Sequence, residues 1–243
     1  MTIVHIHVEK TGGVTLQKLY EDKYGGSHMA HFLIRDGIFA PYSIHTANYT
    51  KNWQLKLYKA ITTWLPNIKR MLVTRRNNRR RKQAISPEDL KKMKVVIGHV
   101  ATAQMIPYLP VAEHQYRTIV REPLDRMWSH YRYWRGHKGD VGHRFAPPYD
   151  AKMTFEEFAL LPALANYQTQ ATGTDPSIYE AIGTTEKLSA FARKTDLITQ
   201  DKHAPILNHF DTEILPELSD EFIKKFEQLH ADDYVFYEYA KSL

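Results

Sequence analysis

Apolar runs and amphipathic segments alternate from the start of the chain. Residues 2 to 8 form an apolar run with two interleaved histidines, a pattern that predicts a buried strand. In residues 13 to 24, Leu16, Leu19 and Tyr20 stand at the i, i+3, i+4 spacing that gives a helix one apolar face. The chain is therefore expected to begin with a strand that turns directly into a helix.

The same alternation continues to the C-terminus. Further strands are predicted at residues 95–97 and 116–120, residues 178–182 fit strand or helix, and residues 26–50 and 137–150 are expected to be irregular. Helices are predicted at residues 52–64, from Pro87, at 123–135, twice within 154–171, at 219–230 and at 232–241. We expect one α/β domain over residues 1–243, with a mainly parallel sheet flanked by helices.

The first strand-to-helix junction, with the sequence HIHVEKTGGVT, combines a lysine with two glycines. Ligands of parallel sheets bind beyond the carboxyl ends of the strands. There, a turn made by Gly12 and Gly13 exposes main-chain N–H groups at a helix N-terminus, and Lys10 adds a positive charge. Thr11 and Thr15 supply hydroxyl groups. The pattern predicts an anion site, although a simple turn beside a solvated lysine explains these residues equally well.

A second junction, with the sequence YRTIVREPLDRMWSHY, repeats this arrangement. Arg121 stands at the end of a predicted strand and Ser129 follows eight residues later, within the predicted helix. A guanidinium and a hydroxyl near a helix N-terminus suit a phosphate monoester. The alternative is that Arg121 pairs with Glu122 or Asp125. Two anion sites at successive strand ends imply one ligand with two separated anionic groups.

Composition narrows the classes of partner and compartment. The chain has 243 residues, no cysteine and a formal charge of +6, which excludes disulfides and favours anionic partners. No apolar run approaches the roughly 20 residues of a membrane span. Residues 1–8 are too short and polar for a signal peptide, so we expect a cytoplasmic protein.

The two junctions together resemble the signature pair of sulfotransferases that use 3′-phosphoadenosine 5′-phosphosulfate (PAPS). The first is similar to the P-loop-like 5′-phosphosulfate loop H-x-P-K-T-G-G-T-S, and the second to the 3′-phosphate motif, an arginine with a serine eight residues on. Four further segments resemble, in order, the carbohydrate-type group that includes heparan sulfate 2-O-sulfotransferases and small bacterial relatives. They are IGHV at 97–100, NYQTQ at 166–170, IGTTEKL at 182–188 and DDYVFYEYA at 232–240.

The resemblance implies in-line transfer of a sulfuryl group from PAPS to an acceptor hydroxyl, with a carbohydrate as the expected acceptor and no metal required. Lys10 would stabilise charge on the leaving phosphate, and His99, in the Gly-His segment, would act as general base. The residues implied to hold PAPS are Lys10, Thr11, Gly12, Gly13, Val14 and Thr15 at the 5′ end, Arg121 and Ser129 at the 3′-phosphate, and Thr184 and Thr185 at the adenine. Asn166 and Gln168 are expected to line the acceptor or cofactor cleft.

Two positions depart from the resembled loop. Glu9 stands where proline is usual, and a carboxylate beside a phosphosulfate is unexpected, so Glu9 is expected to face away and pair with a lysine or arginine. Val14 replaces a hydroxyl residue, which leaves its main-chain N–H as the available donor. Neither change removes the lysine or the glycines of the loop.

Histidines elsewhere have simpler explanations. The chain contains 13 of them, so a structural, hydrogen-bonded imidazole remains the alternative for His99. His5 and His7 share one side of the first strand, and without a carboxylate at useful spacing we interpret them as buried, hydrogen-bonded residues rather than metal ligands.

The run RRNNRRRK at residues 75–82 leaves other functions open. It suits a solvated surface loop best, an acidic glycan next and a nucleic acid least, because no nucleic-acid-binding motif accompanies it, and no nucleic-acid partner is expected. A nucleotide-dependent kinase is the alternative enzyme, although no G-x-x-x-x-G-K-[ST] loop occurs. A basic glycan- or nucleic-acid-binding module is the non-enzymatic alternative.

Overall fold

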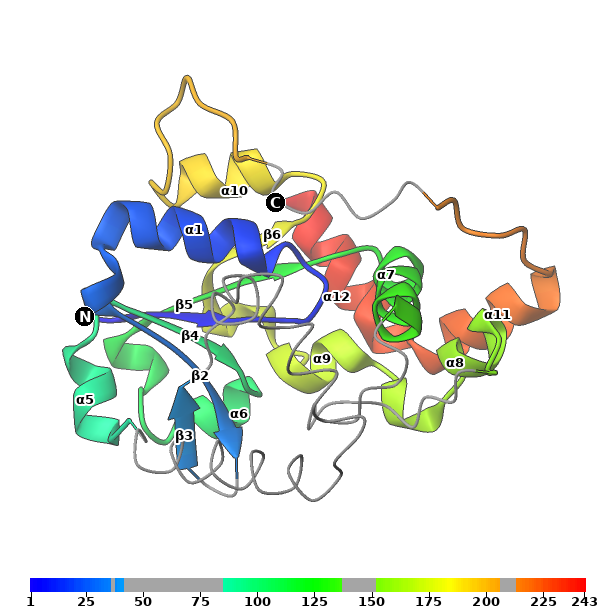
Figure 1. The fold of residues 1–243 in the computed structure, drawn as a ribbon, viewed down its shortest axis with the longest axis horizontal. Helices are drawn as coiled ribbons and strands as arrows, with labels where there is room; N and C mark the ends of the chain where they lie inside the picture. Colours follow the sequence, from blue (N-terminus) through cyan, green and yellow to red (C-terminus); the bar gives the residue numbers. More distant parts are fainter. Residues whose placement is uncertain (36–37, 42–84, 137–151, 206–212) are drawn as a thin grey trace, which may run out of the picture.

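The first apolar run of the chain forms an inner strand of a six-stranded sheet (Figure 1). This computed structural model describes residues 1–35, 38–41, 85–136, 152–205 and 213–243. The strands are β1 (Ile3–Ile6), β2 (Met29–Arg35), β3 (Ile38–Pro41), β4 (Val95–His99), β5 (Gln115–Val120) and β6 (Tyr179–Thr184). They lie in the order β3-β2-β4-β1-β5-β6, and all neighbours are parallel except β2 and β3. The predicted α/β fold with a mainly parallel sheet is confirmed.

Helices cover both faces of this sheet. They are α1 (Gly13–Tyr24), α5 (Pro87–Lys92), α6 (Thr102–Met105), α7 (Pro123–Gly136), α8 (Phe155–Ala159), α9 (Tyr167–Thr172), α10 (Leu188–Lys194), α11 (Asp220–Leu229) and α12 (Ala231–Ser242). Helices α1 and α10 lie on one face of the sheet (Figure 1). Their side chains Leu16, Leu19 and Phe191 are buried with Ile3 and Ile119 of the sheet. Burial of apolar surface stabilises the folded state by about 25 cal/mol per Å². The packing of this layer therefore holds α1 against β1.

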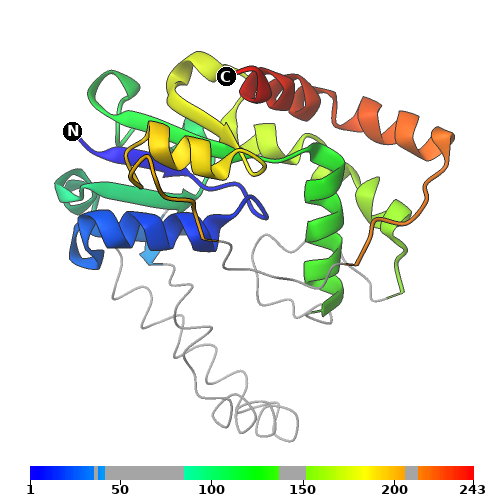
Figure 2. The ribbon, with the colours of Figure 1, turned by 90° about the horizontal axis from the view of Figure 1, so that it is seen from above.

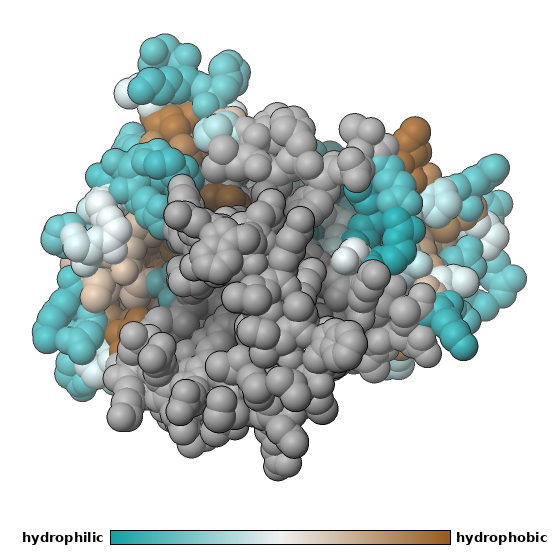
Figure 3. Space-filling model, viewed as in Figure 1, coloured by the Kyte–Doolittle hydropathy of each residue, from teal (hydrophilic) through white to brown (hydrophobic). Residues whose placement is uncertain are grey.

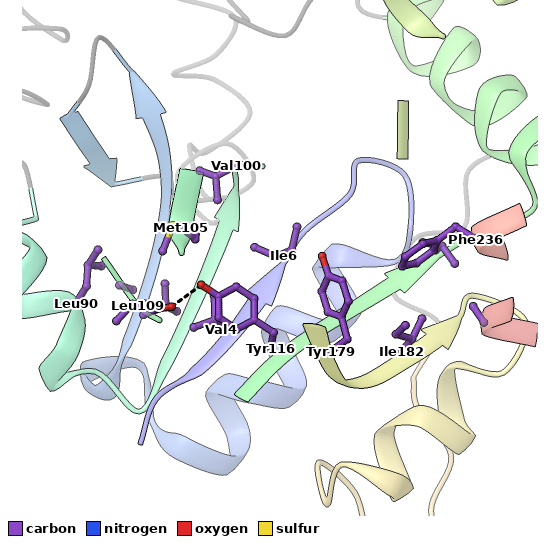
Figure 4. Close-up of a cluster of buried hydrophobic side chains, with 14 of the residues drawn as sticks. Val4, Ile6, Leu90, Val100, Met105, Leu109, Tyr116, Tyr179, Ile182 and Phe236 are labelled. Carbon is purple, nitrogen blue, oxygen red and sulfur yellow. Dashed lines mark hydrogen bonds between the residues drawn. The ribbon is translucent and has the colours of Figure 1, made fainter. Parts of the chain in front are cut away.

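The opposite face is covered by α5, α6 and α12. Val4 and Ile6 of β1 point into this layer (Figure 4). There Tyr116 of β5 contacts Tyr179 of β6, which in turn contacts Phe236 of α12. Along β1, alternate side chains therefore enter opposite cores, and both faces of the strand are buried.

Beyond the carboxyl ends of the strands lies a third cluster, made by α7, α8 and α11. Its centre consists of Trp134, Phe158 and Phe226, each almost fully buried. Figures 1 and 2 show α7 standing across from the N-terminus of α1. This cluster therefore fixes α7 opposite the strand ends, where a ligand of the sheet would bind.

The order of the strands places a topological switch point between β1 and β5, where sheets of this kind have their ligand-binding crevice. From β1 the chain continues to β2 on one side of the sheet, and from β5 it continues to β6 on the other side. Connections that diverge in this way leave an opening at the carboxyl ends of the two strands. The Thr118 hydroxyl of β5 donates to the Ile6 carbonyl of β1 at 3.0 Å, which locks the two strands together beneath this opening.

Several segments were predicted incorrectly or lie outside the described residues. Residues 29–35 and 38–41 lie in a stretch expected to be irregular, but they form the antiparallel pair β2 and β3. The Asp36-Gly37 dipeptide between two apolar runs is a hairpin signal that the prediction overlooked. In the ambiguous stretch 178–182, Ile178 ends a short 3-10 helix and residues 179–182 belong to strand β6. The predicted helix at 52–64, the basic run and the loop at 137–150 fall outside the described residues.

Hydrophilic residues lie over α7 on the face of the molecule that Figure 3 shows. None of the helices in the described part of the chain is both long and apolar enough to cross a membrane.

The buried hydroxyl of Tyr116 offers a test of the core. It donates to the Leu109 carbonyl at 2.6 Å (Figure 4). Tyr116→Phe removes this bond without changing the shape of the core, so we expect a loss of about 1 kcal/mol in the free energy of unfolding, measured with urea. Tyr239→Phe, at a side chain that is 43% exposed, is the matched control and should change little. Equal effects of the two variants would contradict the packing described here.

Candidate anion-binding site at the strand ends

Both glycines after β1 are required by the geometry of the turn. Gly12 has a φ of 81°, in the left-handed region that other residues adopt at a cost. Gly13 lies against the ring of His7, so close that a Cβ atom at position 13 would stand 2.0 Å from it. Lys10 also has a positive φ, of 69°. The turn therefore holds a strained main-chain path, which is typical of functional loops.

The threonine hydroxyls of this turn are used within the protein. Thr11, fully buried, donates to the Val8 carbonyl at 2.8 Å, and Thr15 donates to the Pro205 carbonyl at 3.1 Å. Helix α1 has no hydrogen bond from a capping side chain and no acidic residue in its first turn, within the described residues. Its first N–H groups have no partner inside the helix. Contacts from residues 11–15 to an anion would therefore come mainly from main-chain N–H groups, including that of Val14.

Lys10 lies between the loop and α7. Its Nζ is 4.6 Å from the centre of the Tyr133 ring, a cation–π contact. The pKa of Lys10 is lowered to about 8, chiefly by burial; Glu9 opposes this shift, and the positive charges of Arg121 and Arg132 contribute to it. The ammonium is thus partly desolvated within a cluster of positive charges, where an anion would be stabilised strongly.

Arg121 follows β5 on the other side of the crevice, and its main chain is held by Gln168. The Gln168 amide accepts from the Arg121 N–H at 2.9 Å and donates to the Arg121 carbonyl at 2.8 Å. Gln168 is almost fully buried, so its observed role is to position Arg121; the predicted contact with an acceptor is untested. The Arg121 guanidinium is 4.0 Å from the Asp125 carboxylate, the alternative pairing that the sequence suggested.

Helix α9, which carries Gln168, is itself anchored to α12. The buried Asp233 carboxylate accepts from the N–H groups of Gln168 at 3.1 Å and Thr169 at 2.8 Å, at the N-terminus of α9. Asn166 hydrogen-bonds the side chain and main chain of Asp232 at 3.0 and 3.1 Å. Asn166 therefore joins two helices, and its predicted place in the acceptor cleft remains a prediction.

Of the remaining predicted cofactor residues, Thr184 and Thr185 lie beside the end of β5. Thr184, buried at the end of β6, is paired in register with Val120, and the Thr185 N–H donates to the Val120 carbonyl at 3.0 Å. Ser129 is partly exposed on α7. The structure thus brings the β1, β5 and β6 strand ends to one edge.

His99 ends β4 beside a small cavity. Its ring centre is 4.4 Å from that of His7 and 5.5 Å from that of His31. The cavity has a volume of about 150 Å³, comparable to cavities that admit a six-membered ring. It is lined by His7, Val8, Glu9, His99, Val100, Ala101, Gln104, Tyr167, Gln170 and Ala171. His5 and His7 are buried as expected, and burial lowers the pKa of His5 to about 3.

Glu9 faces away from α1, but its partners differ from those expected. Its Oε2 accepts from the Tyr167 hydroxyl at 3.0 Å and lies 3.3 Å from Nε2 of His130. These two contacts are with a tyrosine and a histidine, where a lysine or arginine was expected. His130, Tyr133 and Tyr167 were missed by sequence reasoning, because only the fold shows that α7 and α9 flank the loop.

Comparisons add no relative to this picture. No protein-family model matches the chain, and no curated protein matches it. The described residues contain no group of three or more histidine, aspartate and glutamate side chains arranged to hold a metal ion.

Gly13→Ala tests the close approach to His7. The added methyl group must displace a ring confined between His5 and His99, so we expect the free energy of unfolding to fall by about 1–3 kcal/mol. Gly26→Ala, where nothing lies within 4 Å, is the control. In the His7→Ala background, the cost of Gly13→Ala should largely disappear, and an undiminished cost there would refute the contact.

Asp233 gives a prediction about acid stability. Burial alone raises the pKa of its carboxyl, but the bonds from His230, Thr169 and Gln168 bring it below the ordinary 3.8. A carboxyl whose pKa is lower in the folded than in the unfolded protein contributes its full stabilisation above the unfolded value. That contribution is lost as pH falls through the folded pKa. In urea titrations, the difference in the free energy of unfolding between wild type and Asp233→Asn should shrink as the pH falls from about 4 to 2. An exposed-site variant, Glu227→Gln, should show no such trend.

Proposed function

We propose that this protein is a PAPS-dependent sulfotransferase that acts on a hydroxyl group, with a carbohydrate as the expected acceptor. The observation that carries the proposal is that the Lys10 loop and Arg121 flank the crevice between β1 and β5. One ligand that spans the crevice would meet a cationic loop at one end and a guanidinium at the other. PAPS carries two anionic groups separated in this manner.

The loop suits the 5′ end of such a ligand. The positive φ of Gly12 and the lack of space at Gly13 keep side chains away from the N-terminus of α1. Its N–H groups, including those of Val14 and Thr15, would bind the 5′-phosphosulfate, and Lys10 would neutralise charge there. PAPS supplies the activated sulfuryl group; the protein positions it.

Discrimination at the other end would come from Arg121. Gln168 fixes the main chain of Arg121. A guanidinium carried by a fixed main chain is well suited to bind a phosphate monoester. Ser129 of α7 would add a hydroxyl, and Thr184 and Thr185 would line the adenine end. This set would favour a 3′-phosphorylated nucleotide over AMP or ATP.

His99 is the proposed general base. It ends β4, next to β1 in the sheet, and lines the cavity that also reaches His7 and Glu9. An imidazole is suited to accept a proton from a hydroxyl at neutral pH. A ring-sized acceptor group in the cavity would bring its hydroxyl to His99.

The first test is binding of 3′-phosphoadenosine 5′-phosphate (PAP), the desulfated product, by calorimetry. We expect a dissociation constant in the micromolar range, which corresponds to a binding free energy on the order of −8 kcal/mol. AMP and ATP should bind far more weakly. Arg121→Ala should abolish the preference for PAP over AMP, because it removes the 3′-phosphate contact.

The controls separate this proposal from its alternatives. Arg193→Ala removes an equal charge from the C-terminal end of α10, away from the Leu188 end that approaches Gly12, and should leave PAP binding unchanged. Tighter binding of ATP than of PAP, or no nucleotide binding at all, would refute the proposal. His99→Ala should retain PAP binding, since it changes the acceptor side.

A further inference from the structure

Glu9 is the residue of the loop that the proposed function leaves unexplained. Its carboxylate is anchored by the Tyr167 hydroxyl at 3.0 Å and contacts Nε2 of His130 at 3.3 Å. The indole N–H of Trp134 also reaches this Nε2 atom, at 2.9 Å, and the Arg126 guanidinium lies 3.4 Å from Nδ1 of the same ring. Glu9 thereby connects the β1–α1 loop to both α7 and α9.

The charge of Glu9 persists in this buried place. Burial alone raises the pKa of the carboxyl, but His130, His99 and Tyr167 lower it to about 2. The Arg126 guanidinium, almost fully buried and 4.4 Å from the centre of the Tyr167 ring, adds a positive charge nearby. Glu9 is therefore ionised at neutral pH, within a low-dielectric region where charges act strongly on each other.

Lys10, the next residue, lies against the same helix as Glu9: its Nζ is 4.6 Å from the centre of the Tyr133 ring, three residues along α7 from the His130 that Glu9 contacts. Other groups nearby disfavour its charge. Burial is the largest of these influences, and Arg121, Arg126 and Arg132 add to it. Glu9 opposes them all, because a neighbouring carboxylate stabilises an ammonium. The Tyr133 ring below Nζ also favours the charged form.

We propose that Glu9 is a positioning residue whose carboxylate, anchored on α9 by Tyr167, keeps the ammonium of Lys10 charged within a cluster of arginines. This role of Glu9 rests on the proposed function, because an anion site needs Lys10 to be protonated when the ligand binds. Facing α7 and α9 rather than the N-terminus of α1, the carboxylate supports this charge without occupying the anion site.

The test measures the titration of Lys10 without any ligand. The rate at which acetic anhydride modifies Lys10, followed by mass spectrometry from pH 6 to 10, reports its neutral fraction, with exposed Lys202 as internal reference. In wild type we expect a midpoint near the pKa of about 8. In Glu9→Gln the midpoint should fall by about one pH unit, because the opposing charge is gone.

The direction of the shift separates this role from a merely structural one. If Glu9 served only to hold the loop, its loss would expose Lys10 to water, and the midpoint would rise toward the ordinary 10.5. A rise, or no change, would overturn the inference. Tyr167→Phe keeps the carboxylate but removes its anchor, so its midpoint should fall less than that of Glu9→Gln. Glu113→Gln makes the same charge change near the amino end of β5 and should shift nothing.

PAP binding in the same variants distinguishes this inference from the proposed function. Wild-type affinity should decline as pH rises through the Lys10 midpoint, and in Glu9→Gln the decline should begin about one pH unit lower. If PAP does not bind but the Lys10 midpoint falls in Glu9→Gln, the proposed function fails and the role of Glu9 stands. If PAP binds and the midpoint does not fall, the role of Glu9 fails alone.

Discussion

The parallel pairing of β1 with β5 is the constraint on which the candidate site depends. It places the carboxyl ends of both strands at one edge, so that Lys10 and Arg121, more than a hundred residues apart in sequence, flank a single crevice. The pairing is fixed by the register His5 to Arg117 and by the Thr118 bond to Ile6. A different neighbour for β1 would leave two unrelated turns in place of one site.

Buried polar groups, rather than apolar packing, fix the details at this edge. Asp233 holds the N-terminus of α9, Gln168 of α9 holds the main chain of Arg121, and Tyr167 of α9 holds Glu9. The Asp233 bond is buried and the other two are partly buried. A buried partner left unsatisfied would cost about 1–3 kcal/mol. Helix α9 is thus the support common to both halves of the site, although it contributes none of the residues proposed to bind PAPS.

The sequence motif and the fold assign different roles to the same residues. Thr11, Gly13 and Gln168 look like ligand contacts when the motif is considered alone. In the structure, Thr11 closes the loop onto Val8, Gly13 makes room for His7, and Gln168 positions Arg121. Motifs combine residues that bind with residues that shape the binding surface, and only packing separates the two.

The sequence by itself determined the local features of this protein. Apolar periodicity predicted β1, α1, β5 and α7, because a buried face imposes its spacing on the chain. Glycines 12 and 13 predicted the turn, because few other residues tolerate its geometry. Tertiary structure alone decided which strand ends meet and where Glu9 points. Those outcomes depend on contacts between residues distant in sequence, and no local pattern encodes such contacts.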